Sequence, residues 1–271
     1  MDLVLELADD AFLDALYPPS MPRDAAPRQV LSLSLITLLG GYALYFSGAT
    51  FSYYFLFDHK IMEHPRFLKN QLRLEIEYAC KSIPVMMALI VPWLFAEVRG
   101  YTKLYSDFNE HSLAYTAFSI VWFLFFTDML IYWIHRWLHH RLVYAAIHKP
   151  HHKWIVTTPF ASHAFHPVDG FLQGLPYHIY LFFFPLHRGV FLVLYVLVNF
   201  WTISIHDGLH VSKNSWLNGA AHHTVHHSDF VYNYGQYFTF WDRLAGSYKE
   251  PNFDDEPEKE ASKQSKANKL D

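Results

Sequence analysis

Three long stretches of the sequence are almost free of charge, and they constrain the fold more than any other feature. Residues 30–57 carry no charge, residues 79–98 carry two charges close to their ends, and residues 112–134 carry only Asp128. A helix rises about 1.5 Å per residue, so some 20 apolar residues can cross a hydrocarbon layer about 30 Å thick. Because charged residues make up only 17% of the chain, we predict an all-α integral membrane bundle with three spanning helices.

A fourth apolar region, residues 170–205, differs from these three. Residues 185–188 break it into halves of about 14 and 17 residues, each short for a full crossing. This pattern favours a short helical hairpin that enters and leaves the bilayer on one side. The segments before and after the hairpin then share an aqueous side, and the lysines and arginines of the short loops there indicate the cytosol.

The chain divides accordingly into four parts. We predict a lumenal N-terminal segment (1–29), transmembrane helices (30–134), a cytosolic histidine-rich helical domain that includes the hairpin (135–249), and a disordered cytosolic tail (250–271).

Histidine is strongly concentrated in one part of the chain. Sixteen of the 19 histidines lie between His135 and His227, in the clusters HRWLHH (135–140), HKPHH (148–152) and HHTVHH (222–227). On a helix, positions i, i+3 and i+4 share a face, yet adjacent rings diverge by about 100°. Three adjacent doublets therefore predict two metal ions rather than one. The scattered residues His59, His64, His111, His178 and His187 are expected to be surface or packed residues.

The number of imidazoles helps to choose the metal. Two catalytic zinc ions would need about six protein ligands, whereas the clusters and His206 offer nine or more. Two ions of higher coordination with open positions fit better, which points to iron and oxygen chemistry. Imidazole also accommodates zinc, copper and nickel.

Several polar residues near the clusters are expected to support the ligands. Asp128 shares a helix stripe with His135 and should accept the free N–H of a ligating ring, unless it is a simple interfacial carboxylate. His163 and His166 are expected beside the ligands or lining a pocket. Asp242 should support the site or pair with the adjacent arginine. His210 is either a ligand or an exposed residue.

The clusters and the strings between them resemble a known family. The order of the three boxes is similar to the eight-histidine signature of membrane-bound desaturases and hydroxylases, in the fatty acid hydroxylase superfamily. The strings TDMLIYWIHR, LVYAAIHKPHHKW, TPFASHAFHPVDGFLQGLPYHIY, WTISIHDGL and YNYGQYFTFWDRLAGSYK closely resemble the C-5 sterol desaturases. The resemblance covers roughly residues 127–249.

This resemblance implies a di-iron oxygenase of the endoplasmic reticulum membrane whose active site faces the cytosol. It would use O2 to introduce the C-5(6) double bond into a 3-hydroxy sterol already unsaturated at carbon 7, on a route to ergosterol or cholesterol. The alternative is a sterol methyl or fatty acyl hydroxylase on the same scaffold. Carried over position by position, the ligands are His135, His139, His140, His148, His151, His152, His206, His223, His226 and His227. His210 and His222 are left out of this set.

The reaction needs two electrons from outside, because the sequence has no Gly-rich dinucleotide loop and no haem-attachment motif. The resemblance implies cytochrome b5, reduced by an NAD(P)H-dependent reductase. Basic residues near the clusters are expected to dock this carrier or to hold lipid headgroups: Arg136, Arg141, Lys149, Lys153, Lys213 and Arg243. The sterol should arrive from the bilayer, along Trp122, Phe126, Trp133 and Trp201 unless these rings only pack or anchor helices.

Two other classes of protein fit less well. A metal transporter should bind its ion near the bilayer midplane, whereas these histidines follow the ends of predicted helices. A zinc hydrolase would need a general base as in HExxH, and the sequence has no such motif. No nucleic-acid partner is expected.

Overall fold

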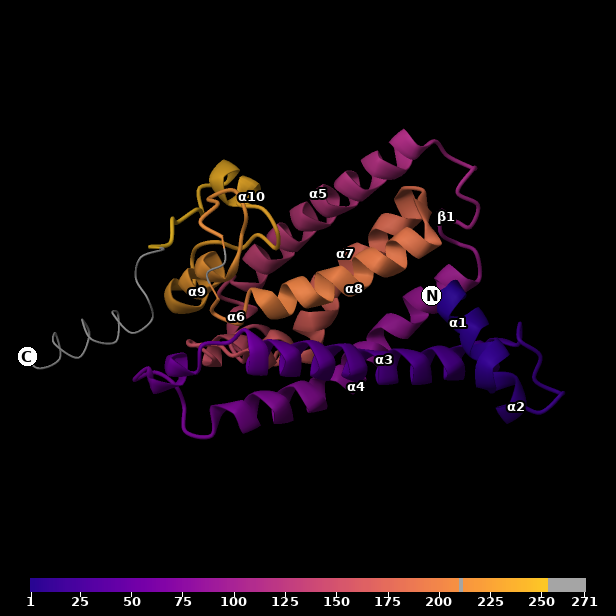
Figure 1. Cartoon of the computed structure of the whole chain (residues 1–271), viewed down its shortest axis with the longest axis horizontal. Helices are drawn as coiled ribbons and strands as arrows, with labels where there is room; N and C mark the ends of the chain where they lie inside the picture. The colour runs from indigo at the N-terminus through magenta and orange to yellow at the C-terminus, as the bar shows by residue number, and fades with distance from the viewer. Residues whose placement is uncertain (210–211, 253–271) are drawn as a thin grey trace, which may run out of the picture.

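The computed structural model describes residues 1–209 and 212–252. His210 and residues 253–271 of the predicted tail lie outside the described residues. The elements, labelled as in Figure 1, are α1 (Asp2–Ala8), a π-helical turn (Asp9–Leu13), α2 (Asp14–Leu16), α3 (Ala26–Phe55), α4 (Gln71–Val98), β1 (Leu104–Tyr105), α5 (Leu113–Leu138), α6 (Tyr144–Ile147), α7 (Pro167–Phe183), β2 (Leu186–His187), α8 (Arg188–Ser204), α9 (Ala220–Asp229) and α10 (Phe240–Leu244). Short 3-10 turns cover His59–Glu63, His151–Lys153 and Pro159–His163.

Among the described residues, three helices have the length and apolar composition of membrane spans, as predicted. They are α3, α4 and α5, with 30, 28 and 26 residues. At about 1.5 Å per residue each is longer than a hydrocarbon core is thick. The outward side of α3 is apolar, with exposed Leu31, Leu35 and Leu39, as expected for a surface that faces lipid. The all-α membrane fold is therefore confirmed.

The predicted hairpin is formed by α7 and α8, and each helix has 17 residues. Helix α7 starts before the apolar run because the His166 side chain accepts a hydrogen bond from the Val168 backbone N–H and caps it. The tip of the hairpin carries β2, which pairs in parallel with β1. Since β1 belongs to the connection between α4 and α5, the hairpin reaches the far end of these helices.

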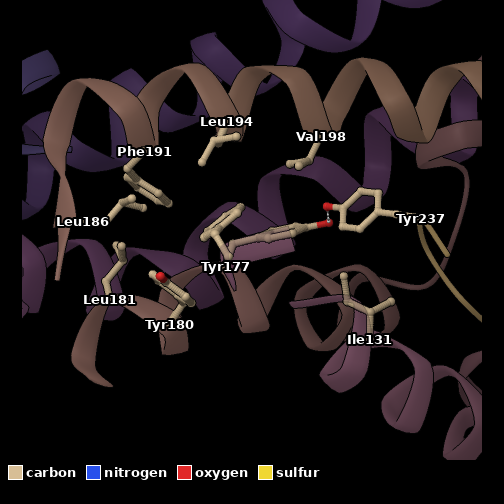
Figure 2. Close-up of a cluster of buried hydrophobic side chains, with 10 residues drawn as sticks. Ile131, Tyr177, Tyr180, Leu181, Leu186, Phe191, Leu194, Val198 and Tyr237 are labelled. Carbon is tan, nitrogen blue, oxygen red and sulfur yellow. Dashed lines mark hydrogen bonds between the residues drawn. The ribbon is translucent and has the colours of Figure 1, made fainter. Parts of the chain in front are cut away.

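An aromatic core joins the hairpin to α5. Its buried members include Phe123 of α5, Tyr177 and Tyr180 of α7, and Phe191 of α8 (Figure 2). Tyr237, from the segment before α10, inserts into the same core, where its hydroxyl donates to the Tyr177 hydroxyl at 3.1 Å. The core therefore links the C-terminal segments to the apolar helices.

The histidine-containing segments gather at one end of the bundle. Helices α6, α9 and α10 lie there, where α5 ends and α8 ends (Figure 1). The N-terminal helices α1 and α2 lie at the opposite end (Figure 1). The hairpin thus brings the segments on both of its sides to one face, as its predicted topology requires.

Candidate metal centre

Nine histidines form two groups at this end of the bundle. In each group, one ring nitrogen of every member lies within 4.8 Å of those of the other members. All nine rings are buried except that of His139, which is half-buried. The first group consists of His135, His139, His148, His152 and His226, and the second of His151, His206, His223 and His227.

The spacing within each cluster explains how the groups divide. Residues four apart share a group, as His223 and His227 do, whereas His226, three after His223, belongs to the other group. The adjacent residues His151 and His152 also belong to different groups. Neighbouring rings on one turn diverge by about 100°, so a short segment supplies both groups.

The hydrogen bonds of the first group determine which nitrogen faces the centre. His135 Nδ1 lies 3.0 Å from the Tyr234 carbonyl and His148 Nδ1 lies 2.7 Å from an Asp169 carboxylate oxygen. Both Nδ1 atoms must donate, so each neutral ring presents an Nε2 lone pair. These two Nε2 atoms are only 3.1 Å apart. Two lone pairs at this distance repel each other, and a cation between them would remove the repulsion.

The second group repeats this arrangement. His206 Nδ1 donates to the Thr202 carbonyl at 2.7 Å, and its Nε2 lies 3.0 Å from His223 Nε2. The Nε2 atoms of His223 and His227 are 3.1 Å apart. Converging imidazole nitrogens on buried rings are the donor set of a metal site, so the residues present fit two metal ions.

Burial keeps these rings in the form that binds metal. Removal from water lowers the pKa of His151 and His223 well below the usual range, and lowers the pKa of His206 to about 4. Desolvation disfavours the charged imidazolium, so these three rings stay neutral near pH 7. A metal-ligating imidazole must be neutral.

Sequence reasoning missed the carboxylate that orients a ring of the first group. The Asp169 carboxylate accepts from His148 Nδ1 and, through its other oxygen, from Gln173 Nε2 at 2.7 Å. Asp169 is buried in the first turn of α7. One feature of the sequence could have indicated this role, because Asp169 is the only carboxylate between Lys153 and Asp207.

Asp128 does not contact an imidazole, so the expected contact is corrected. Its carboxylate accepts from the backbone N–H groups of Gln236, Tyr237 and Phe238, at 2.9, 2.7 and 3.4 Å. The segment after α9 directs these N–H groups toward α5, so the carboxylate binds backbone donors instead of an imidazole. Asp128 therefore supports the site indirectly, by holding this segment against α5.

Asp242 holds the same segment from the other side. It accepts from the backbone N–H groups of Tyr234 and Gly235, both at 2.9 Å. Arg243 instead donates to the Ser215 carbonyl at 3.0 Å. Together, the two aspartates fix the loop whose Tyr234 carbonyl orients His135.

The remaining predicted site residues lie outside both groups. His140 is exposed, and its Nδ1 accepts from the Leu142 backbone N–H at 3.4 Å. It lies two residues after the end of α5 and outside the group that His139 joins. His163 lines a cavity beside the centre, and His166 caps α7. His222 is buried beside the Tyr248 ring and belongs to neither group.

A cavity leads from the histidine groups into the bundle. His135, His151, His206 and His223 are among the residues that line it. A second, more apolar cavity lies between α3, α4 and α8 and shares its lining with the first at Met86, Met87, Ile90, His163, His178, Tyr195 and Asn199. The two cavities therefore adjoin each other along these shared residues.

Loss of the Asp128 carboxylate is expected to destabilise the site. In Asp128→Leu, three backbone N–H groups lose their acceptor, and each buried unsatisfied group costs about 1–3 kcal/mol. We expect the free energy of unfolding to fall by about 3 kcal/mol or more, measured as a lower unfolding temperature in detergent. Asp128→Asn keeps one acceptor oxygen and should lose much less. Equal stability of the leucine variant and the unmodified protein would contradict this role.

Comparison with known proteins identifies the family. The model of the fatty acid hydroxylase family matches residues 120–247. The chain is 57% identical to human "Lathosterol oxidase" over 258 residues, which are 93% of this chain and 86% of the relative. The chain belongs to the lathosterol oxidase family. It is also 50% identical to a "Delta(7)-sterol 5(6)-desaturase" of Schizosaccharomyces pombe over 254 residues, 93% of this chain and 85% of the relative.

This membership agrees with the resemblance noted in the sequence. All nine histidines of the two groups, together with Asp169, fall inside the segment matched by the family model. No solved structure matches this chain.

Proposed function

We propose that this protein is a sterol desaturase that introduces the C-5(6) double bond into a delta-7 sterol. The observation that carries the proposal is the pairing of two buried, neutral histidine groups with relatives named for this reaction. The protein would act in the biosynthesis of ergosterol- or cholesterol-type sterols. Its proposed location is the endoplasmic reticulum membrane, with the histidine groups facing the cytosol.

Two iron ions bound by the histidine groups would supply the activation of O2, using two electrons from an external donor. The first group offers five ring nitrogens and the second four. Both sets leave coordination positions open if the ions are six-coordinate. Asp169 and the carbonyls of Thr202 and Tyr234 hold the ligand rings in one tautomer, which keeps their free nitrogens aimed at the centre.

The paired cavities offer a route from the bilayer. The outer cavity is lined largely by apolar side chains of α3, α4 and α8, including Ile36, Leu44 and Val196. A flat apolar sterol can move along such a surface without crossing water. This route differs from the aromatic one expected from the sequence, because Trp122 and Phe126 pack against the core between α5 and the hairpin.

Electrons are proposed to come from cytochrome b5 and its NAD(P)H-dependent reductase. Several basic side chains near the histidine groups are exposed: Arg141, Lys149, Lys153, Lys213 and Arg243. A basic surface attracts an acidic electron carrier and speeds its encounter with the protein. Anionic lipid headgroups can use the same charges.

Expression in cells that lack C-5 sterol desaturation tests the proposed function. We expect the delta-7 sterol to be consumed and a conjugated diene, which absorbs in the ultraviolet, to accumulate. A hydroxylase would instead yield an alcohol without diene absorption. Accumulation of an alcohol, or no change in sterol profile despite protein in the membrane, would reject the desaturase.

Narrowing the outer cavity is expected to weaken sterol binding. In Val196→Trp, the indole takes up space in the cavity, so a bound sterol must displace it or be overpacked against it, at a cost of about 1–3 kcal/mol. This corresponds to a rise in KM of about 5- to 150-fold. The measurement is diene formation against sterol concentration in vesicles. Val193 lies on the exposed side of α8, so Val193→Trp is the matched control. An unchanged KM in the cavity variant would exclude this route.

A further inference from the structure

The chemistry of a 3-hydroxy sterol limits where its hydroxyl can bind. This inference rests on the proposed function, in which carbons 5 and 6 face the histidine groups. Three bonds separate the hydroxyl oxygen from carbon 5, so at about 1.5 Å per bond the two atoms are at most about 4.5 Å apart. A residue that binds the hydroxyl must therefore line the cavity beside the histidines.

Gln236 lies beside the histidines, two residues after Tyr234, whose carbonyl contacts His135. It is held at three points. Its backbone N–H donates to Asp128 at 2.9 Å, and its carbonyl accepts from Trp201 Nε1 at 2.7 Å. Its side-chain Nε2 donates to Thr202 Oγ1 at 3.0 Å. The residue lines the same cavity as His206 and His223.

The hydroxyl of Thr202 fixes the orientation of the Gln236 amide. Thr202 Oγ1 donates its proton to the Val198 carbonyl at 2.9 Å, so it can only accept from Gln236. The amide nitrogen must then face Thr202, and Oε1 takes the other position. The Thr202 carbonyl in turn accepts from His206 Nδ1, which ties the amide to the second histidine group through one residue.

Within the part of the chain that the structure describes, the Gln236 side chain makes its hydrogen bond through Nε2, and no donor reaches Oε1. We propose that this oxygen accepts the hydrogen bond from the 3-hydroxyl of the sterol, which makes Gln236 a residue that determines specificity. A hydroxyl removed from water needs such a partner. A rigid acceptor places the hydroxyl, and with it carbons 5 and 6, at a defined distance from the ligand rings.

A second polar group in the cavity, His178, is less well placed for this role. His178 Nε2 is buried and has no partner within the described residues, and the ring lines both cavities. However, His178 follows Asp169 by nine residues on α7, about 13 Å along the helix axis. His178 is therefore less well placed than Gln236, which is linked to His206 through Thr202. In this arrangement the sterol lies with its hydroxyl at Gln236 and its hydrocarbon tail toward the second cavity, between α3, α4 and α8.

The test compares two substrates with two enzymes. We measure kcat/KM for diene formation from a delta-7 3-hydroxy sterol and from its 3-deoxy analogue, with the protein and with Gln236→Met. We expect the unmodified protein to prefer the hydroxy sterol by about 10-fold or more, since an unpaired buried acceptor costs about 1–3 kcal/mol. In Gln236→Met, which has a similar size and no acceptor amide, this preference should fall to within about twofold of unity.

Gln173→Met is the matched control, because Gln173 lines the same cavity but donates its amide to Asp169. This variant should keep the preference whatever happens to its overall rate. Gln236→Asn shortens the side chain by one methylene, which moves the amide away from the hydroxyl, so this variant should also lose most of the preference for the 3-hydroxy sterol. It serves as a second test if the methionine variant accumulates poorly. A full hydroxyl preference in either Gln236 variant would overturn the inference. Absence of diene from the unmodified protein would instead reject the proposed function.

Discussion

Replacing His226 with alanine is expected to abolish diene formation while the protein remains in the membrane. His226 Nδ1 donates to the Tyr232 carbonyl at 2.7 Å, and its buried Nε2 has no partner within the described residues. The ring is thus held in place with one nitrogen free for a metal. Loss of supporting residues typically costs about 10- to 100-fold in metal affinity or activity, so loss of a ligand should cost more than about 100-fold.

Two measurements check this prediction: the iron content of purified protein and the sterol profile of expressing cells. His140→Ala is the control, because His140 is exposed and lies outside both groups. It should retain iron and activity, although position-by-position resemblance places His140 among the ligands. Normal diene formation by His226→Ala would remove this ring from the proposed metal centre. Inactivity of His140→Ala would restore that residue as a ligand.

Replacing Asp169 with asparagine is expected to lower activity or metal affinity by about 10- to 100-fold. The buried carboxylate accepts the Nδ1 proton of His148. An amide can still accept through its oxygen, but it carries no charge and can present its N–H2 group to the ring instead. His148 would then lose its fixed tautomer and part of its basicity toward the metal.

Metal titration of the purified protein, followed by diene formation at saturating metal, separates weaker binding from a slower reaction. Asp10→Asn is the matched control, because Asp10 is exposed and pairs with Arg23 at the opposite end of the bundle. Exposed ion pairs contribute at most about 1 kcal/mol, so this variant should behave like the unmodified protein. Equal metal affinity and activity in Asp169→Asn would show that the carboxylate does not support the centre.

Most of the membrane fold could be predicted from composition and length. The apolar runs are long enough to span, and a backbone in lipid must satisfy its own hydrogen bonds, so the runs had to be helices. The hairpin was predictable because Pro185 and the polar residues after it interrupt the fourth run. The length of α7 was not predictable from the apolar run, because its start depends on capping by His166.

The supporting residues of the site were harder to predict than the clusters. Asp128 lies on the same stripe of α5 as His135, yet it binds backbone N–H groups that are more than 100 residues later in the chain. Asp169 lies 21 residues from His148 and contacts it only because α7 folds back beside the second cluster. Helical periodicity describes neighbours within one segment and contains no information on such distant contacts.

The sequence by itself determined that the chain forms apolar spanning helices and that its histidines can serve two metal ions, since both follow from local spacing and length. Only the tertiary structure decided which rings share a group, which carboxylate orients a ligand and which side chains line the cavity. Those choices depend on how α5, the hairpin and the segment after α9 pack together, and packing is set by long-range contacts that no local pattern encodes.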